Sequence, residues 1–176
     1  MRMKHQAQKH KMTKGMNVAT SWVPSVFTQK DLDKTRADGL LSDDDQVIFP
    51  STERIPKPRD GFWVMFFAFL LRGLSLPAHE FLHGLLFVYG VQLHQLTPNS
   101  ILYIACFITL CESFLGIDPH FLLWISLFRL RPSVALSKKP ELGGACISVR
   151  SELRYLEFSM SASVQGWRTK WFYIKD

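Results

Sequence analysis

Hydrophobic positions between residues 60 and 132 recur at the spacing of amphipathic helices, and similar boundaries flank each apolar run. Proline stands at or near the first position of several predicted helices, and glycine directly follows the last position. This asymmetry is expected of helix ends. We therefore predict helices over residues 61–72, 77–89, 98–115 and 119–130. The expected N-caps are Asp60, Thr97 and Asp118, and the expected C-caps are Gly90 and Gly116.

The pattern changes after Pro132. Three later segments are short, loosely alternating and rich in strand-forming residues, namely 145–150, 155–160 and 171–175. We therefore expect an α+β fold that is predominantly α-helical, with about four packed helices followed by a small C-terminal β element.

Residues 1–59 differ in character from this domain, which we expect to span residues 60–176. Residues 17–59 show little periodicity, and they contain an acidic cluster at 43–45 and a proline-rich stretch near 55–58, as a linker does. Residues 1–16 contain no acid, and their cations are Arg2, Lys4, Lys9, Lys11 and Lys14. We predict a disordered basic arm that is a candidate for nucleic-acid binding or nuclear import, and a solvated tail is the simpler interpretation.

Composition narrows the class of protein. The chain has 176 residues, 47% of them hydrophobic and 13% aromatic, which suits a folded domain, and its net charge of +6 comes in part from the basic arm. The arm lacks the apolar core of a secretory signal, so we expect an intracellular protein, nuclear or cytoplasmic, with buried, reduced cysteines. Charges interrupt each apolar run, so no membrane partner is expected, and no cofactor or small-molecule substrate is indicated.

Residues 79–83 have the sequence HEFLH, which matches the HExxH pattern of zinc hydrolases. On a helix, His79 and His83 share a face and can bind one zinc ion, while Glu80 can act as general base on the metal-bound water. A catalytic zinc needs a third protein ligand, for which Glu112 is the candidate. This set defines a zinc metallohydrolase as one hypothesis.

The opposing interpretation is an ordinary helix face. Leu86 and Tyr89 occupy the positions of glycine and histidine in the extended zinc pattern, and the spacing of His94 and His120 does not support either as a ligand. Residues 78–89 also carry an apolar stripe with the motif on its edge and opposite face. We therefore favour a chain without a catalytic residue or a metal.

The segment 167–175 interleaves aromatic and cationic residues. Such a pattern is used by stacking platforms for single-stranded nucleic acid. It is equally typical of a strand whose aromatic side chains are buried while its cations extend to solvent, and we favour that second interpretation.

Taken together, residues 61–176 resemble the gypsy-type transposon domain found in plant genomes. The resemblance is carried by residues 76–79, 84–102 (GLLFVYGVQLHQLTPNSIL), 107–121 (FITLCESFLGIDPHF), 166–167 and 170–173. It implies a retrotransposon-derived domain from a gag-like or accessory region without catalytic activity. It also implies that HEFLH arose by drift, since the family shows aromatic residues and a basic residue at positions 80–83.

We therefore expect a non-catalytic domain for self-association or nucleoprotein assembly, whose partners are further copies of itself or other retroelement proteins. Nucleic acid is a secondary expected partner through the basic arm. The alternative is the zinc metallohydrolase described above.

Overall fold

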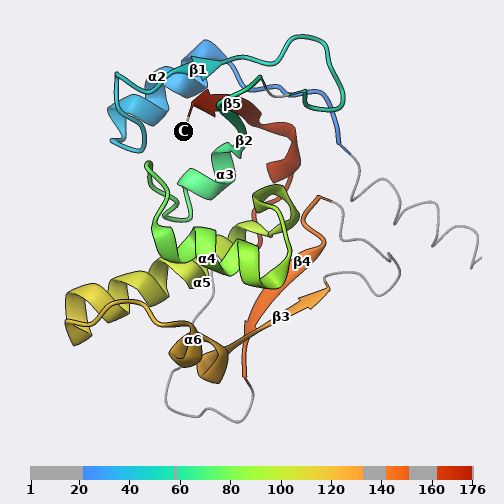
Figure 1. Ribbon diagram of the computed structural model, residues 1–176. Coiled ribbons are helices and arrows are strands. Elements are labelled where there is room, and N and C mark those ends of the chain that lie inside the picture. The colour runs from blue at the N-terminus through green and yellow to red at the C-terminus, as the bar shows by residue number, and fades with distance from the viewer. Residues whose placement is uncertain (1–21, 58, 133–141, 151–161, 176) are drawn as a thin grey trace, which may run out of the picture.

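The computed structural model describes residues 22–57, 59–132, 142–150 and 162–175 (Figure 1). Of these residues 41% are helical and 17% lie in strands, and the strands form two separate small sheets. The fold is therefore a mixed α+β arrangement.

The larger sheet joins segments that lie far apart in the sequence. Strand β5 (Trp171–Lys175) is central, and it pairs antiparallel with β1 (Val47–Ile48) on one side and β2 (Phe62–Phe66) on the other. The smaller sheet pairs β3 (Phe128–Pro132) antiparallel with β4 (Ala145–Val149). Figure 1 shows β5 and β2 on the opposite side of α4 and α5 from α6.

Five α-helices are described: α2 (Gln29–Ala37), α3 (Phe67–Leu70), α4 (Glu80–Tyr89), α5 (Pro98–Thr109) and α6 (Phe121–Leu127). A π-helical turn, η2 (Leu110–Leu115), continues α5, and the short 3₁₀ helices are η1 (Leu93–Gln95) and η3 (Trp167–Thr169). Three of the predicted caps are confirmed. The Thr97 hydroxyl accepts a hydrogen bond from the Ser100 amide at 3.3 Å, and Gly90 and Gly116 adopt the left-handed conformation after α4 and η2.

The predicted fold class, predominantly helical with about four packed helices, is wrong. Residues 62–66 form strand β2 rather than the first half of a helix, because their main chain pairs with β5 and their aromatic and branched side chains suit a half-buried sheet. The last predicted helix is also too long. Helix α6 ends at Leu127, and residues 128–132 form strand β3. The predicted strand at 155–160 lies outside the described residues.

Residues 22–57 carry secondary structure although the sequence suggested a linker. Helix α2 begins with a capping box between Thr28 and Asp31, and β1 forms one edge of the larger sheet. The Phe27 ring is 6% exposed and stacks on Phe172 with ring centroids 4.5 Å apart. This part of the chain therefore contributes to the hydrophobic core.

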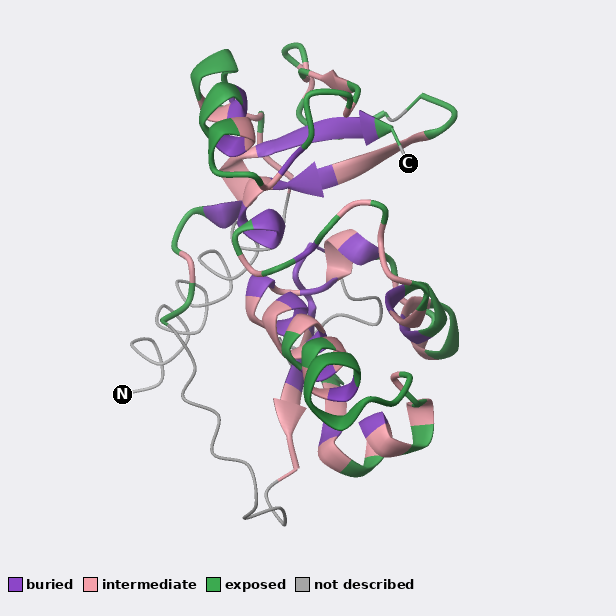
Figure 2. Ribbon diagram, turned by 90° about the vertical axis from the view of Figure 1, so that its left-hand side faces the viewer, coloured by how far each residue is buried: buried purple, intermediate pink, exposed green. Residues whose placement is uncertain are grey.

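The core is aromatic, and it extends from the larger sheet to the inner faces of α4, α5 and α6 (Figure 2). Its largest fully buried side chains include Trp124, Trp171, Phe66 and Phe107. The buried indole N–H groups are satisfied: Trp124 donates to the Tyr89 hydroxyl at 3.0 Å, and Trp171 donates to the Val23 carbonyl at 2.9 Å. The aromatic residues of segment 167–175 thus lie in the core, as the favoured interpretation predicted, and do not form an exposed stacking platform.

Candidate functional site

The HEFLH motif lies at the start of α4, and its first histidine caps the helix. His79 has extended backbone geometry, and its Nδ1 accepts a hydrogen bond from the Phe81 amide at 3.0 Å. The helix therefore begins at Glu80, three residues after the predicted start. Since Nδ1 is an acceptor here, the ring proton resides on Nε2.

That Nε2 lies 2.9 Å from Oε1 of Glu112, which belongs to the π-helical turn η2. The neutral imidazole therefore donates to the carboxylate and connects the start of α4 to the end of the α5–η2 helix. The side chains of His79 and Glu112 are 34% and 47% exposed, so water screens the pair and its contribution to stability is at most about 1 kcal/mol. The structure thus brings together two of the four residues in the zinc hypothesis.

The other two residues of the motif lie on the exposed side of α4. The His83 ring is tilted against the indole of Trp63, with ring centroids 5.4 Å apart, and Glu80 is exposed. Two further histidines are described: His94 lies against Trp22, and His120 caps α6 through a hydrogen bond from the Leu122 amide. Within the described residues, no three His, Cys, Asp or Glu side chains gather closely enough to hold a metal ion.

The cysteines differ in environment. All three are free thiols, but only Cys111 is buried, while Cys106 is exposed and Cys146 is intermediate. Burial, with a smaller effect from the charge of Glu112, raises the pKa of the Cys111 thiol. That thiol is therefore a poor nucleophile near neutral pH. The expectation of buried thiols holds for Cys111 alone.

The cations proposed for nucleic-acid binding, Arg2, Lys4, Lys9, Lys11 and Lys14, lie outside the described residues. Three cations of the C-terminal segment 167–175 are described, and two of them, Lys170 and Arg168, make side-chain contacts. The Lys170 ammonium is 2.6 Å from a carboxylate oxygen of Asp31, and the Arg168 guanidinium lies over the Trp167 ring at 4.6 Å. These two side chains therefore serve contacts within the fold.

An apolar groove lies between the turn that follows α3 and one face of the α5–η2 helix. Its volume is about 470 Å³, and its lining residues are Leu71, Arg72, Gly73, Leu102, Ala105, Cys106, Thr109, Leu110 and Phe114. Phe114 is 78% exposed and Leu71 is 49% exposed.

In the described part of the chain, one helical stretch, 98–115, is long and apolar enough to cross a membrane by length and composition. The core helices of other proteins also pass this test.

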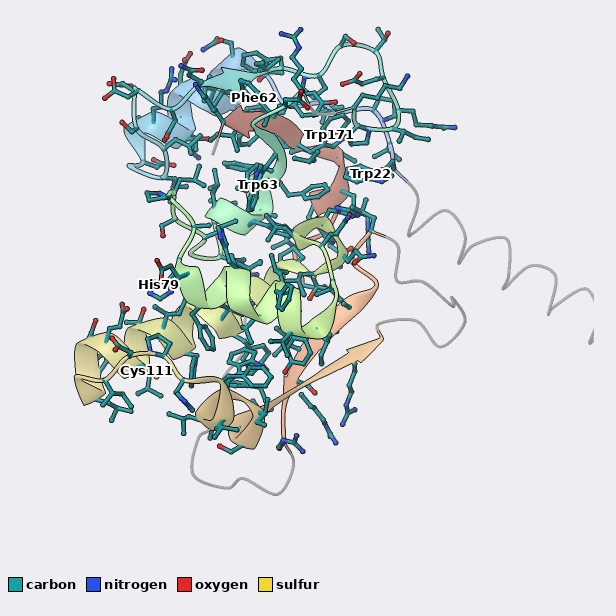
Figure 3. All side chains as sticks on the ribbon, in the orientation of Figure 1. Trp22, Phe62, Trp63, His79, Cys111 and Trp171 are labelled. Carbon is teal, nitrogen blue, oxygen red and sulfur yellow. The ribbon has the colours of Figure 1, made fainter. Side chains whose placement is uncertain are left out.

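A second hollow, which we name the aromatic pocket, lies beside β2 and η1. Its volume is about 400 Å³, and its lining residues are Trp22, Ile55, Pro56, Phe62, Trp63, Val64, Gln92, Leu93 and His94. Trp22, Phe62 and Trp63 are labelled in Figure 3. Sequence reasoning missed this pocket, because its residues come from four separate segments and no motif connects them.

The fold and these sites define a small mixed α+β domain that has an apolar groove and an aromatic pocket, with no assembled metal centre among the described residues. Residues 64–132, which run from β2 through β3, match the family model described as "Putative gypsy type transposon". The predicted resemblance to that family is confirmed for this segment, although the match does not show a plant origin. The chain matched no curated protein and no solved structure.

Proposed function

We propose that this chain is a non-catalytic assembly domain of a gypsy-type retroelement, and that it associates with a second copy of itself through the apolar groove. The observation that carries the proposal is the exposed apolar surface at the end of the α5–η2 helix. Phe114, Leu115 and Ile117 are 78%, 53% and 46% exposed, and Phe114 adjoins Leu71 in the groove. Contiguous exposed apolar surface of this kind is typical of interaction sites.

The composition of the helix argues for an apolar partner. Residues 98–115 contain a single charged residue, Glu112, and its carboxylate is already paired with His79. A charged partner would therefore find a single counter-charge on this helix, the Glu112 carboxylate. A second copy offers an equally apolar surface, and in paired identical subunits the same patch usually meets itself.

Two further observations support an assembly role. The segment that matches the transposon family, 64–132, contains every residue that lines the groove. In addition, the two histidines of the zinc hypothesis already have structural contacts: His79 caps α4, and His83 packs on Trp63.

The test is the mass of the full chain in solution, measured by sedimentation equilibrium over a range of concentrations. We expect a dimer for the wild type. Phe114→Lys places a charge in the interface and removes a large buried contact, so we expect it to weaken association about 10- to 150-fold. The matched control is Phe87→Lys, because Phe87 is 87% exposed and does not line the groove.

A wild type that remains monomeric, or a Phe114→Lys variant that associates like the wild type, would refute the proposal. If the wild type instead floats with lipid vesicles and Phe114→Lys does not, the apolar groove binds a membrane surface.

One contact favours the zinc metallohydrolase as a second candidate, namely the approach of Glu112 to His79 within 2.9 Å. Elemental analysis of purified wild type and His79→Ala discriminates the two functions. Stoichiometric zinc in the wild type that is lost in the variant would overturn the non-catalytic proposal, whereas a self-associating chain without zinc would support it.

A further inference from the structure

The aromatic pocket is not used by the proposed self-association, and it shares no lining residue with the apolar groove. Its walls are aromatic: Trp22 and His94 have ring centroids 5.4 Å apart, and Trp63 and Phe62 come from β2. The volume of about 400 Å³ lies within the range of pockets that bind small planar ligands.

Several polar side-chain groups of the residues that line this pocket make no hydrogen bond to another described residue. Among the described residues, the ring nitrogens of His94 and the indole N–H groups of Trp22 and Trp63 make no hydrogen bond, in contrast to the N–H groups of Trp124 and Trp171. Gln92 also lines the pocket, and its side chain takes part in a capping box with Gln95 at the start of η1. Burial lowers the pKa of His94, so its imidazole is neutral near pH 7 and presents one donor and one acceptor.

These features specify a ligand class. A flat heteroaromatic ring can stack on the aromatic walls, and its edge can exchange hydrogen bonds with neutral donors and acceptors. The bases of nucleic acids combine these two properties, and stacking of one base on an aromatic side chain contributes about 1–3 kcal/mol. In a duplex the base faces are already stacked, so a strand must present an unpaired base.

Cations next to the pocket suit the phosphates of such a strand. Phe62 also lines a neighbouring hollow that contains Lys57 and Arg59, both exposed. The acid in that hollow, Glu53, accepts a hydrogen bond from the Tyr173 hydroxyl.

We infer that the aromatic pocket binds an unpaired base of single-stranded nucleic acid, with Lys57 and Arg59 contacting the flanking phosphates. Base stacking here is independent of sequence because every base has two flat faces. The phosphate contacts make the affinity fall with added salt.

The first experiment uses the wild-type full chain and fluorescence anisotropy. Labelled single-stranded DNA and RNA are compared with an abasic chain of the same length and charge, with a duplex and with a free mononucleotide. We expect the strands to bind about 5- to 150-fold more tightly than the abasic chain, which offers phosphates but no base. Equal affinity for the strand and the abasic chain, or for the strand and the duplex, would overturn the inference. Binding of the mononucleotide without any gain for the strand would overturn the assignment to a polymer.

Variants locate the site. Trp63→Ala should lose most of the advantage of the strand over the abasic chain, while Phe87→Ala, an exposed aromatic outside the pocket, should retain it. The pair Lys57→Ala and Arg59→Ala should reduce the slope of log affinity against log salt by about 1.4 while leaving base stacking intact. If Trp63→Ala does not fold, Trp63→Leu, which keeps an apolar side chain but has no aromatic face, replaces it and should lose the same advantage. Full strand preference in a folded Trp63→Ala would refute the assignment to this pocket.

The two proposals can be separated. Phe114→Lys, which is designed to break self-association, should bind the single strand at the pocket with unchanged preference over the abasic chain. Loss of that preference in Phe114→Lys would contradict an independent base site.

Discussion

At the residue scale, Tyr173 connects the C-terminal strand to the segment that precedes β2. Its hydroxyl donates to the Glu53 carboxylate and accepts a hydrogen bond from the Lys57 amide at 2.8 Å. The side chain is 6% exposed. Burial first, and the hydrogen bond to Glu53 second, raise the pKa of Tyr173 to about 12.

This pKa predicts a loss of stability at high pH. An unfolded tyrosine has a pKa of about 10, so the folded protein holds the proton more tightly than the unfolded chain. The stabilisation is complete below pH 10, and it falls as the pH rises from about 10 to about 12, by at most about 3 kcal/mol. Urea unfolding of the wild type and Tyr173→Phe should show a shallower decline for the variant over that range. Parallel declines would contradict the role of Tyr173.

The candidate site was predictable at this scale only in part. The zinc pattern drew attention to His79 and Glu112, and these two side chains do meet. The sequence could not show that His79 would cap α4 through Nδ1, because the pattern assumes that both histidines lie within the helix. Nor could the sequence predict the contact between the rings of Trp22 and His94, since that contact depends on the tertiary fold.

At the element scale, the predictions that held rest on local chemistry. Thr97 before Pro98 and glycine at 90 and 116 define helix ends through contacts within a few residues. The prediction failed for residues 62–66, because their strand pairing requires Trp171–Lys175, more than a hundred residues later. A run of aromatic and branched side chains fits a buried helix as well as a strand, and only the distant partner decides between them.

The position of α2 and β1 predicts where the folding unit begins. A fragment of residues 61–176 lacks the Phe27 ring that packs on Phe172, and it lacks the strand that pairs with one side of β5. We expect this fragment to lose cooperative thermal unfolding and to aggregate, whereas residues 22–176 should unfold in one transition. Circular dichroism with light scattering distinguishes the two fragments. A cooperative fragment 61–176 would place the start of the unit at residue 60, as the sequence suggested.

At the scale of the whole molecule, β5 (171–175) joins the two strands β1 and β2 from the first half of the chain into one sheet. It is hydrogen-bonded on both sides, and Trp171, Phe172 and Ile174 are at most 1% exposed. Opening this strand therefore requires most of the core to separate. By contrast, the end of the α5–η2 helix has exposed side chains and a hydrogen bond between His79 and Glu112 that is partly open to solvent.

Hydrogen exchange should reveal this difference. We expect the amides of residues 172–174 to exchange only through global unfolding, and those of η2 at least about tenfold faster through local opening, because few buried contacts hold η2 in place. Mass spectrometry of peptic fragments measures both. Equal protection of the two segments would show that the molecule opens as a single unit.

The central place of β5 also has a consequence for protein synthesis. On the ribosome, Phe66 is made 105 residues before Trp171, an interval of about 5–20 s at ordinary elongation rates. Throughout that time β1 and β2 lack the strand that pairs with both of them, and their unpaired edges are open to chaperones or to aggregation. Chains that terminate before residue 171 would remain in that state, so the codons for residues 171–175 decide whether the nascent chain completes its sheet.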